Sequence, residues 1–352
     1  MIFGVPSDIA LAPAEERRVA LTPSAASELV EAGHTVLVQQ GAGTGAGYDD
    51  QSYREAGADI AWQRAEVMAR SDVVTTLARL IPADLAVLRP ETPVLAFHQL
   101  GLAPASLRRQ YAEADIVAVG LDRLRQPDGT YPVVAALAEL AGALAPQLAA
   151  RLLESSGPGR AGVLLGRLPG VAPAEVVILG AGTLGVTAAA RFLALGCSVH
   201  LLDRDLEVLR RAAAALPGAV TTTRSTPDAV ARATRFANVL VGAVRLGAEP
   251  VPVLVPEALV AKMRPGAVIL DFAIAEGGVV ATSRPIHTPE DSYAVHGVWH
   301  LSMPRCTTLV ARTASRVLSA ALLPYLQLLG QGVTPKAHRV FAPAIHFGED
   351  QP

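Results

Sequence analysis

The 352-residue chain contains very little lysine and very little cysteine. Lys and Arg together number 30, but only Lys262 and Lys336 are lysines, so nothing before position 262 can supply a lysine amine. With Cys197 and Cys306 as the only cysteines, a multi-disulfide scaffold and a cysteine-based zinc cluster are both excluded. The formal net charge of −2 and the scattered basic residues give no electrostatic case for a nucleic-acid partner.

Long uncharged apolar runs are also missing. None reaches the ~18–20 residues that span a bilayer, and the most apolar stretch, 133–153, contains Glu139, Pro146 and Arg151. We expect a buried or linking helix there and no membrane partner. The first residues have no basic leader and carry Asp8 within an apolar stretch, which is untypical of a signal peptide. We therefore expect a cytoplasmic protein.

What the chain does contain is an alternation of short aliphatic runs with longer helical stretches, which favours an α/β architecture with parallel sheets. Its length suggests two domains. A Pro-Asp-Gly turn at 127–129 marks a break, and a lone helical stretch at 313–329 is expected to pack back on the first part. Strands are predicted at 34–38, 73–76, 94–97, 116–120, 175–179, 198–203, 239–244 and 268–273. We predict two doubly wound, Rossmann-like parallel-sheet domains: a discontinuous one of residues 1–130 and 305–352, and one of residues 131–304.

The strongest chemical signal is a glycine-rich turn that follows the strand predicted at 175–179. Gly180 permits a tight turn, Gly182 lets the backbone approach a pyrophosphate, and Gly185 lets the following helix pack closely on the strand. The N–H groups at the start of that helix then meet the phosphates. Ala181, Thr183 and Leu184 complete this predicted dinucleotide site.

An acidic residue at the end of the next strand supports the same interpretation. Asp203 lies about 20 residues on, where a carboxylate accepts the adenosine ribose hydroxyls. Its charge repels a 2′-phosphate and favours NAD over NADP, although the adjacent Arg204 tempers that preference. The alternative is a purely structural glycine-rich turn.

A second glycine cluster, at 41–47, also follows a predicted strand. The next residues, Tyr48, Asp49 and Asp50, are bulky and acidic where a phosphate-binding helix needs small residues and free N–H groups. We expect a flexible loop there that covers the cofactor, in preference to a second nucleotide site.

Further motifs occur in a fixed order along nearly the whole chain. They lie at 18–23, 33–38, 41–43, 162–166, 169–174, 225–227, 242–244, 263–266, 276–278 and 282–285. Together they resemble the alanine dehydrogenase and nicotinamide nucleotide transhydrogenase α-subunit family. The resemblance implies a substrate domain, an NAD domain with Ala243 among its cofactor-binding residues, an active site in the cleft between them, and a homo-oligomer.

The resemblance also implies an activity and a set of catalytic residues. Alanine dehydrogenases interconvert an amino acid with a 2-oxo acid and ammonium, whereas transhydrogenase relatives pass hydride to another nicotinamide. The dehydrogenases use an Arg and a Lys on the substrate, a His as acid/base and an Asp near the reacting centre. Arg18 corresponds to the Arg, and its guanidinium fork suits a carboxylate. The alternative is a surface ion pair with Glu15 or Glu16.

The chain departs from this set at the lysine and histidine positions. Thr76 corresponds to the Lys, either as a hydrogen-bonding group without charge or as a packed strand residue. Arg79, three residues along, is a candidate substitute for the Lys. Gln99 corresponds to the His, with His98 beside it. Because neighbouring strand residues point to opposite faces, only one of the two can face the substrate. Gln99 would orient the substrate without exchanging a proton. If the strand end is shifted, His98 becomes the acid/base instead. The alternative for His98 is a histidine that is packed in the protein.

The Asp position corresponds to Ala275. Glu276 is one residue along and is a candidate carboxylate for the active site, whereas Asp271 is expected to be structural. Arg312 matches a family segment near the active site, with an ion pair between the domains as its alternative. Losing Lys, His and Asp together is expected to abolish ordinary alanine dehydrogenation unless other groups take over, since a placed proton-transfer group contributes about 10²–10⁴-fold in rate.

These observations favour an NAD-dependent oxidoreductase that acts on an amino acid, 2-oxo acid or imine, with Arg18 holding a carboxylate and no metal ion. An imine that arrives already formed demands less acid/base help than a ketone plus ammonium. Two alternatives remain open. One is a non-catalytic NAD(H)-binding protein, and the other is a lyase or cyclodeaminase that uses NAD without net turnover.

Overall fold

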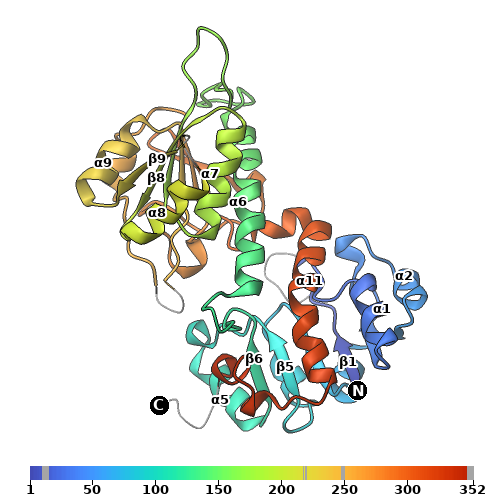
Figure 1. The fold of residues 1–352 in the computed structure, drawn as a ribbon. Coiled ribbons are helices and arrows are strands. Elements are labelled where there is room, and N and C mark those ends of the chain that lie inside the picture. Colours follow the sequence, from blue (N-terminus) through green and yellow to red (C-terminus); the bar gives the residue numbers. More distant parts are fainter. Residues whose placement is uncertain (10–15, 217, 219, 247–249, 347–352) are drawn as a thin grey trace. The chain divides into compact units, whose positions relative to one another are not determined.

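The computed structural model describes residues 1–9, 16–216, 218, 220–246 and 250–346. The chain divides into two compact units (Figure 1). Unit 1 comprises Met1–Leu137 and Thr307–Pro352, and unit 2 comprises Ala138–Cys306. One division falls inside helix α6 (Pro132–Leu153), so this helix is shared by the two units.

Unit 1 contains a six-stranded sheet in the order β3-β2-β1-β4-β5-β6, with every neighbouring pair parallel. Most of its strand residues are buried, as expected for a parallel sheet covered on both faces. The strands are β1 (Ile2–Val5), β2 (Thr35–Gln39), β3 (Asp59–Ala61), β4 (Val73–Thr75), β5 (Pro93–Ala96) and β6 (Val117–Gly120).

The helices of unit 1 are α1 (Pro23–Glu31), α2 (Asp50–Glu55), α3 (Arg64–Arg70), α4 (Pro82–Leu85), α5 (Ala105–Glu113) and α11 (Ala311–Gly330). Helix α1 begins at Pro23 because proline suits the first helical position. Helix α11 comes from the end of the chain and buries Leu318, Leu322 and Leu326 in the same core as β1 and β2. The C-terminal part of the chain therefore completes the core of unit 1.

Unit 2 contains a seven-stranded sheet in the order β12-β13-β11-β10-β7-β8-β9, in which only the β12–β13 pair is antiparallel. Its strands are β7 (Glu175–Leu179), β8 (Ser198–Asp203), β9 (Val220–Arg224), β10 (Val239–Gly242), β11 (Val268–Asp271), β12 (Tyr293–Val295) and β13 (Val298–Leu301). Its helices are α7 (Thr183–Ala194), α8 (Leu206–Ala215), α9 (Pro227–Phe236) and α10 (Glu257–Val260).

Helix α6 packs on α7 through Gly142. A Cβ added at Gly142 would lie 2.6 Å from the carbonyl oxygen of Leu184, so the two helices approach closely at this point. By length and composition, α6 is the one helix of the described residues that could span a membrane, and 44% of its apolar window is buried. Buried helices of globular proteins pass the same criterion, so α6 is weak evidence for a membrane segment.

The predicted architecture of two parallel-sheet α/β domains is confirmed, and strands β7 and β8 have the predicted bounds. Five strands were not predicted: β1, β3, β9, β12 and β13. They are short or, like β9, polar and partly exposed, so hydrophobic patterning alone does not identify them. The omission of β1 from the predicted strands matters most, because β1 pairs with both β2 and β4 at the centre of the sheet.

Candidate functional site

The sheet of unit 1 has a position where its strand order reverses. The chain passes from β1 outward to β2 and β3 on one side, and from β4 outward to β5 and β6 on the other. Open parallel sheets bind ligands at such a switch point, beyond the carboxyl ends of the strands. Asp8 follows β1 and Thr76 follows β4, and the two side chains hydrogen-bond to each other.

Unit 2 has an equivalent switch point between β7 and β10. The chain runs outward from β7 to β8 and β9 on one side, and from β10 to β11 and β13 on the other. The turn at Gly180 follows β7, and Ala243 follows β10, donating its backbone N–H to Leu179 O over 2.7 Å. The predicted cofactor residues therefore lie where a ligand of this sheet is expected.

Close packing explains two of the three glycines in this turn, and open space accompanies the third. Gly180 has φ +105°, and a Cβ there would lie 2.5 Å from Ala243 O. At Gly185 a Cβ would lie 1.9 Å from Gly180 O. At Gly182 it would meet nothing within 4 Å. Gly182 precedes α7, whose first turn contains Thr183 and Leu184, and forms no side-chain cap. The open space at the start of this helix suits a phosphate group.

The carboxylate of Asp203 is held against this turn. Its Oδ2 accepts the backbone N–H of Ala181 at 2.7 Å, and its Oδ1 accepts that of Asp205 at 2.9 Å. The neighbouring Arg204 is exposed, and Arg224 on β9 is in register with Asp203. The arrangement combines a fixed acceptor with two nearby cations.

In unit 1, Arg18 is buried and paired with a carboxylate. Its Nε and Nη2 donate to the two oxygens of Glu16 at 2.7 and 2.6 Å, and its Nη1 donates to Thr307 Oγ1 at 2.9 Å. The ion pair with Glu16, the alternative for Arg18, is therefore present, but it is buried rather than at the surface; Glu15 lies outside the described residues. A guanidinium has five N–H donors, and three of those of Arg18 are used in these bonds.

The glycine cluster at 41–47 packs against the backbone beside Arg18. A Cβ at Gly45 would lie 2.6 Å from Arg17 O, and one at Gly43 would lie 2.7 Å from the ring of Tyr53. Arg312 donates to Gly47 O at 2.7 Å within the same unit. Close packing, rather than a need for flexibility, therefore accounts for Gly43 and Gly45.

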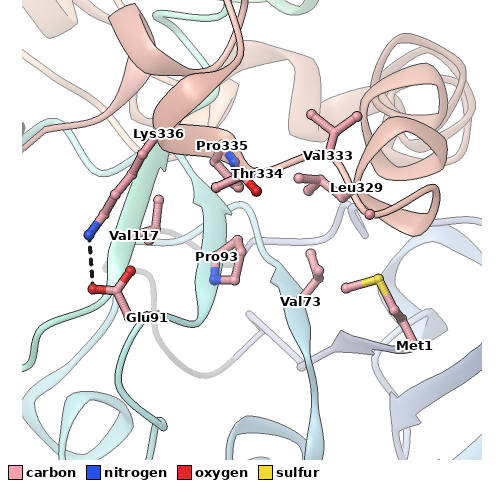
Figure 2. Close-up of a pocket in the computed structure, with 11 residues that line it drawn as sticks. Met1, Val73, Glu91, Pro93, Val117, Leu329, Val333, Thr334, Pro335 and Lys336 are labelled. Carbon is pink, nitrogen blue, oxygen red and sulfur yellow. Dashed lines mark hydrogen bonds and ion pairs between the residues drawn. The ribbon is translucent and has the colours of Figure 1, made fainter.

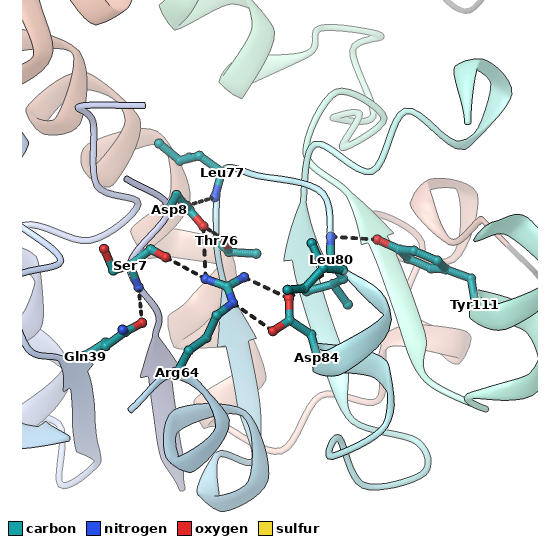
Figure 3. A network of polar contacts seen from close by, with 10 residues as sticks. Ser7, Asp8, Gln39, Arg64, Thr76, Leu77, Leu80, Asp84 and Tyr111 are labelled. Atoms are coloured by element: carbon teal, nitrogen blue, oxygen red, sulfur yellow. Dashed lines mark hydrogen bonds and ion pairs between the residues drawn. The ribbon is translucent and has the colours of Figure 1, made fainter. Parts of the chain in front are cut away.

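Thr76 belongs to a polar network that we call the Asp8 cluster: Asp8, Arg64, Thr76 and Asp84 (Figure 3). The Thr76 hydroxyl donates to Asp8 Oδ1, and the Leu77 N–H donates to Asp8 Oδ2 at 2.7 Å. Asp8 is 4% exposed and Thr76 is 0% exposed. Burial raises the pKa of the Asp8 carboxyl, against the lowering effects of the Thr76 hydrogen bond and the Arg64 charge.

Arg64 joins two parts of the cluster, as Figure 3 shows. Its Nε and Nη2 donate to the two oxygens of Asp84 at 2.7 and 3.0 Å. Its Nη1 donates to Ser7 O at 2.7 Å and approaches Asp8 Oδ1 at 3.4 Å. The fork geometry with Asp84 is the stronger interaction.

His98 lies in the interior of unit 1. It is 0% exposed, with Nε2 3.0 Å from Val94 O and Nδ1 3.2 Å from the Tyr111 hydroxyl. Its ring also contacts that of His346 edge to face. Burial lowers the pKa of His98 to about 4 and that of His346 to about 3. Both rings are therefore neutral around pH 7.

Gln99 lies beyond the carboxyl end of β5 and is exposed. Its backbone is left-handed, with φ +47°, which turns the chain immediately after His98. Arg79 holds this turn, because its Nε donates to His98 O at 2.6 Å and its Nη2 to Gln99 O at 3.0 Å. Of the two neighbours, Gln99 is the one accessible from outside, and Arg79 acts on the backbone between them.

In unit 2, Ala275 and Glu276 are half-buried in a short 3₁₀ turn after β11. Asp271, at the end of β11, accepts backbone N–H groups from Ala273, Val279 and Val280 at 3.0–3.3 Å. These bonds shape the loop that carries Glu276, and burial raises the pKa of Asp271. Asp271 thus has the geometry of a structural acid.

A cavity of about 280 Å³ lies at the amino ends of the unit 1 strands, at the end of the sheet opposite to Asp8 and Thr76 (Figure 2). Val73, Pro93 and Val117, the first residues of β4, β5 and β6, line it, and an ion pair of 2.8 Å joins Lys336 to Glu91 at its side. Ligands of open parallel sheets bind at the carboxyl ends of the strands, so this cavity is not where a ligand of the sheet is expected.

In the described part of the chain, no group of three or more His, Cys, Asp or Glu residues could hold a metal ion.

The sequence reasoning missed Asp8 and Arg64 as members of a site. Asp8 stands out in the sequence only as a charge in an apolar stretch, and its partner Thr76 is 68 residues away. The signal that could have identified it is a short aliphatic run, Ile2–Val5, followed by a turn and an acid. No local signal marks Arg64.

Two family models together match most of the chain, and the second extends beyond residue 306 into the C-terminal part of unit 1. A model described as "Alanine dehydrogenase/PNT, N-terminal domain" matches residues 4–141, and one described as "Alanine dehydrogenase/PNT, C-terminal domain" matches residues 145–343. An alanine dehydrogenase of Halomonas elongata is 34% identical over 337 residues, covering 96% of this chain and 90% of that protein. One of Mycobacterium tuberculosis is 34% identical over 333 residues, with coverages of 94% and 88%.

Two solved structures are similar over nearly the whole chain. An L-alanine dehydrogenase has a TM-score of 0.90 at 34% identity, covering 99% of this chain and 95% of that one. A transhydrogenase from Sinorhizobium meliloti has a TM-score of 0.80 at 22% identity, with 94% of each chain covered. The second likeness concerns the fold alone.

Proposed function

The chain belongs to the alanine dehydrogenase/PNT family, and we propose that it is an NAD-dependent oxidoreductase. Its substrate is an amino acid, a 2-oxo acid or an imine that carries a carboxylate, and hydride is transferred at the α-carbon. We assign the substrate to residues 1–130 with 305–352 and the cofactor to residues 131–304. A cytoplasmic location and a homo-oligomeric state remain predictions.

The observation that carries the proposal is the glycine turn of unit 2. Gly180 and Gly185 allow close backbone approaches, and Gly182 leaves open space before α7. These features fit a pyrophosphate, and Asp203 would accept the ribose hydroxyls. Bound NAD would supply the hydride acceptor, and its reduced form the donor. The negative charge of Asp203 favours NAD over NADP, and the positive charge of Arg204 makes this preference smaller.

The substrate side rests on Arg18. Glu16 and Thr307 fix the guanidinium, so its two remaining N–H groups are oriented before the substrate arrives. Gln99, exposed beyond β5, would orient the reacting group by hydrogen bonds. Glu276 remains a candidate carboxylate on the cofactor side. We assign His98 to packing, because both ring nitrogens already have partners in the interior.

The proposal includes a change of substrate or reaction relative to alanine dehydrogenases. Thr76, Gln99 and Ala275 stand where the resemblance places the catalytic Lys, His and Asp. A preformed imine needs less proton transfer and no attack by ammonium, so it suits this reduced set.

Turnover assays test the proposal directly. Purified protein is mixed with NADH and pyruvate plus ammonium, other 2-oxo acids, or cyclic imines bearing a 2-carboxylate, and with NAD and a panel of amino acids. We expect turnover with at least one carboxylate substrate, faster with NAD(H) than with NADP(H). No change in NADH across the whole panel contradicts the proposal.

The same three replacements favour a second candidate, a non-catalytic NAD(H)-binding protein. It predicts NADH binding by fluorescence titration without turnover. A lyase or cyclodeaminase predicts product from an amino acid with no net change in NADH, which product analysis with a labelled amino acid detects.

A further inference from the structure

Asp8 is a buried carboxyl at the switch point of unit 1 to which the function above gives no role. It lies beyond β1, where its Oδ1 meets the Thr76 hydroxyl and its Oδ2 meets the Leu77 N–H. Thr76 is the residue that stands where the resemblance places a catalytic lysine. The acid and the position of the missing lysine are therefore in direct contact.

The charges around Asp8 do not balance. Arg64 directs Nε and Nη2 to Asp84 at 2.7 and 3.0 Å and forms a longer ion pair, of 3.4 Å, from Nη1 to Asp8. Glu16, whose negative charge also acts on Asp8, is itself paired with Arg18. Among the described residues, the Asp8 cluster thus contains two carboxyl groups and one guanidinium. Asp8 therefore shares its cation with Asp84, and a buried carboxyl in that position favours its neutral form.

With Asp8 ionised, the Thr76 hydroxyl donates to Oδ1 as described above, whereas with Asp8 neutral the same contact has the opposite direction. The Oδ2 of neutral Asp8, as the carbonyl oxygen, still accepts the Leu77 N–H, while the Oδ1 hydroxyl donates to Thr76 Oγ1. The Thr76 hydroxyl hydrogen can then turn toward a ligand. With Asp8 ionised, that hydrogen is used within the protein and Thr76 has no proton to offer.

We propose that Asp8 and Thr76 form a proton-donating pair for the reducible C=N or C=O group of the substrate. The inference rests on the proposed function. In this proposal Thr76, which is 0% exposed in the chain alone, contacts the bound substrate, and Asp8 acts through it as a positioning and proton-supplying residue. The pair occupies the place that the family's lysine takes.

In the direction of reduction, the substrate takes up one hydride and one proton. The substrate carbon accepts hydride from the reduced nicotinamide dinucleotide of the proposed function, and the C=N or C=O π electrons move to the nitrogen or oxygen. That atom takes the Thr76 hydroxyl proton, and Thr76 Oγ1 takes the Asp8 proton. Asp8 is left as a carboxylate, and Thr76 is unchanged. Water returns a proton to Asp8 after product release.

Asp8→Asn and Thr76→Val test the pair, with Thr75→Val as the matched control. Thr75 is buried one residue earlier, and its hydroxyl has no hydrogen-bond partner in the described structure. Infrared difference spectra of the full chain at about pH 7, wild type minus Asp8→Asn, need no substrate. We expect a protonated-carboxyl band in the wild type that Asp8→Asn lacks.

Kinetics of reduction supply the second measurement, with NADH and pyruvate plus ammonium or a cyclic 2-carboxy imine. We expect kcat to fall about 10²–10⁴-fold in Asp8→Asn and Thr76→Val, and to be unchanged in Thr75→Val. The wild-type rate falls as pH rises through the raised pKa of Asp8, and Asp8→Asn loses that dependence. If Asp8→Asn does not fold, the kcat and pH profile of Thr76→Val alone decide whether the proton-donating pair exists.

The outcomes separate this inference from the proposed function. No carboxyl band, or turnover by Thr76→Val at the wild-type rate and pH profile, overturns the proton-donating pair while leaving the oxidoreductase intact. Absence of turnover by the wild type overturns the oxidoreductase, and the infrared result still decides whether Asp8 holds a proton.

Discussion

The switch points of the two units lie at the same kind of place in their sheets but are built differently. In unit 2 the turn after β7 is shaped by glycine backbone, and its main side chain, Asp203, comes from the neighbouring strand. In unit 1 the corresponding position is formed by side chains, with Asp8 bonded to Thr76 and Arg64 to Asp84. A site made of backbone is constrained by local sequence, whereas a site made of side chains can change its chemistry while the fold stays the same.

The largest expected effect concerns the acid sensitivity of unit 1, whose interior contains a neutral histidine. His98 is neutral in the fold, with its pKa lowered by burial to about 4 from 6.5. The folded state therefore binds fewer protons than the unfolded state, and stability is lost as pH falls from about 6.5 to about 4. We expect His98→Gln to remove up to about 3 kcal/mol of this loss.

Urea unfolding at about pH 7 and about pH 4.5 measures the difference. Equal losses in wild type and His98→Gln would show that the histidine is already charged or accessible in the folded protein. The exposed His287→Gln serves as the control and should behave as the wild type does.

The next effect tests the backbone site. Gly182→Val puts a side chain into space that no protein atom fills, so the fold should be unaffected while NADH affinity falls about 100-fold or more. Titration by NADH fluorescence gives the affinity, and the thermal midpoint reports the fold. Gly157→Val, also in unit 2 with open space around it, is the control. NADH affinity that survives Gly182→Val unchanged would remove this turn from the cofactor site.

Arg18→Lys tests the substrate side in the same way. Lysine keeps the charge but cannot pair with Glu16 and a substrate carboxylate through one planar fork. We expect KM for the carboxylate substrate to rise about 10–100-fold, as lost charged hydrogen bonds imply, with NADH affinity unchanged. Steady-state kinetics with the best substrate of the panel gives KM. A weakened NADH affinity together with an unchanged KM would reverse the assignment of the two units.

The smallest effect concerns the choice of cofactor. Asp203→Ser removes the charge that repels a 2′-phosphate and leaves Arg204 and Arg224 nearby, so preference should move toward NADPH by about 10-fold. The ratio of kcat/KM for NADPH and NADH measures it. Asp205→Ser is the control, because Asp205 caps α8 and serine is also a good cap. A ratio that stays constant would mean that Asp203 faces away from the ribose.

The same difference between the units explains how far the sequence alone could predict this molecule. Strands β7 and β8, the turn between β7 and α7, and Asp203 follow one another within about 30 residues, so a local pattern identifies them. The sequence also excludes a lysine at the position that the resemblance assigns to Thr76, because the chain has no lysine before Lys262.

The surroundings of Thr76 were not visible. Its partner Asp8 lies 68 residues away and follows β1, a strand of four residues that patterning did not detect. One of the two partners of Arg18, Thr307, is 289 residues away. Which of His98 and Gln99 is accessible depends on the left-handed backbone of Gln99 beyond the end of β5, and no sequence pattern predicts that conformation.

A crystal structure of the chain with NADH and pyruvate, or with a 2-carboxy imine, tests the central claim most directly. The account predicts pyrophosphate at Gly182, the ligand carboxylate on Arg18, and the reducible C=O or C=N group within hydrogen-bond distance of Thr76 Oγ1. A ligand held by His98 or Arg79, with Thr76 remote from it, would contradict the account.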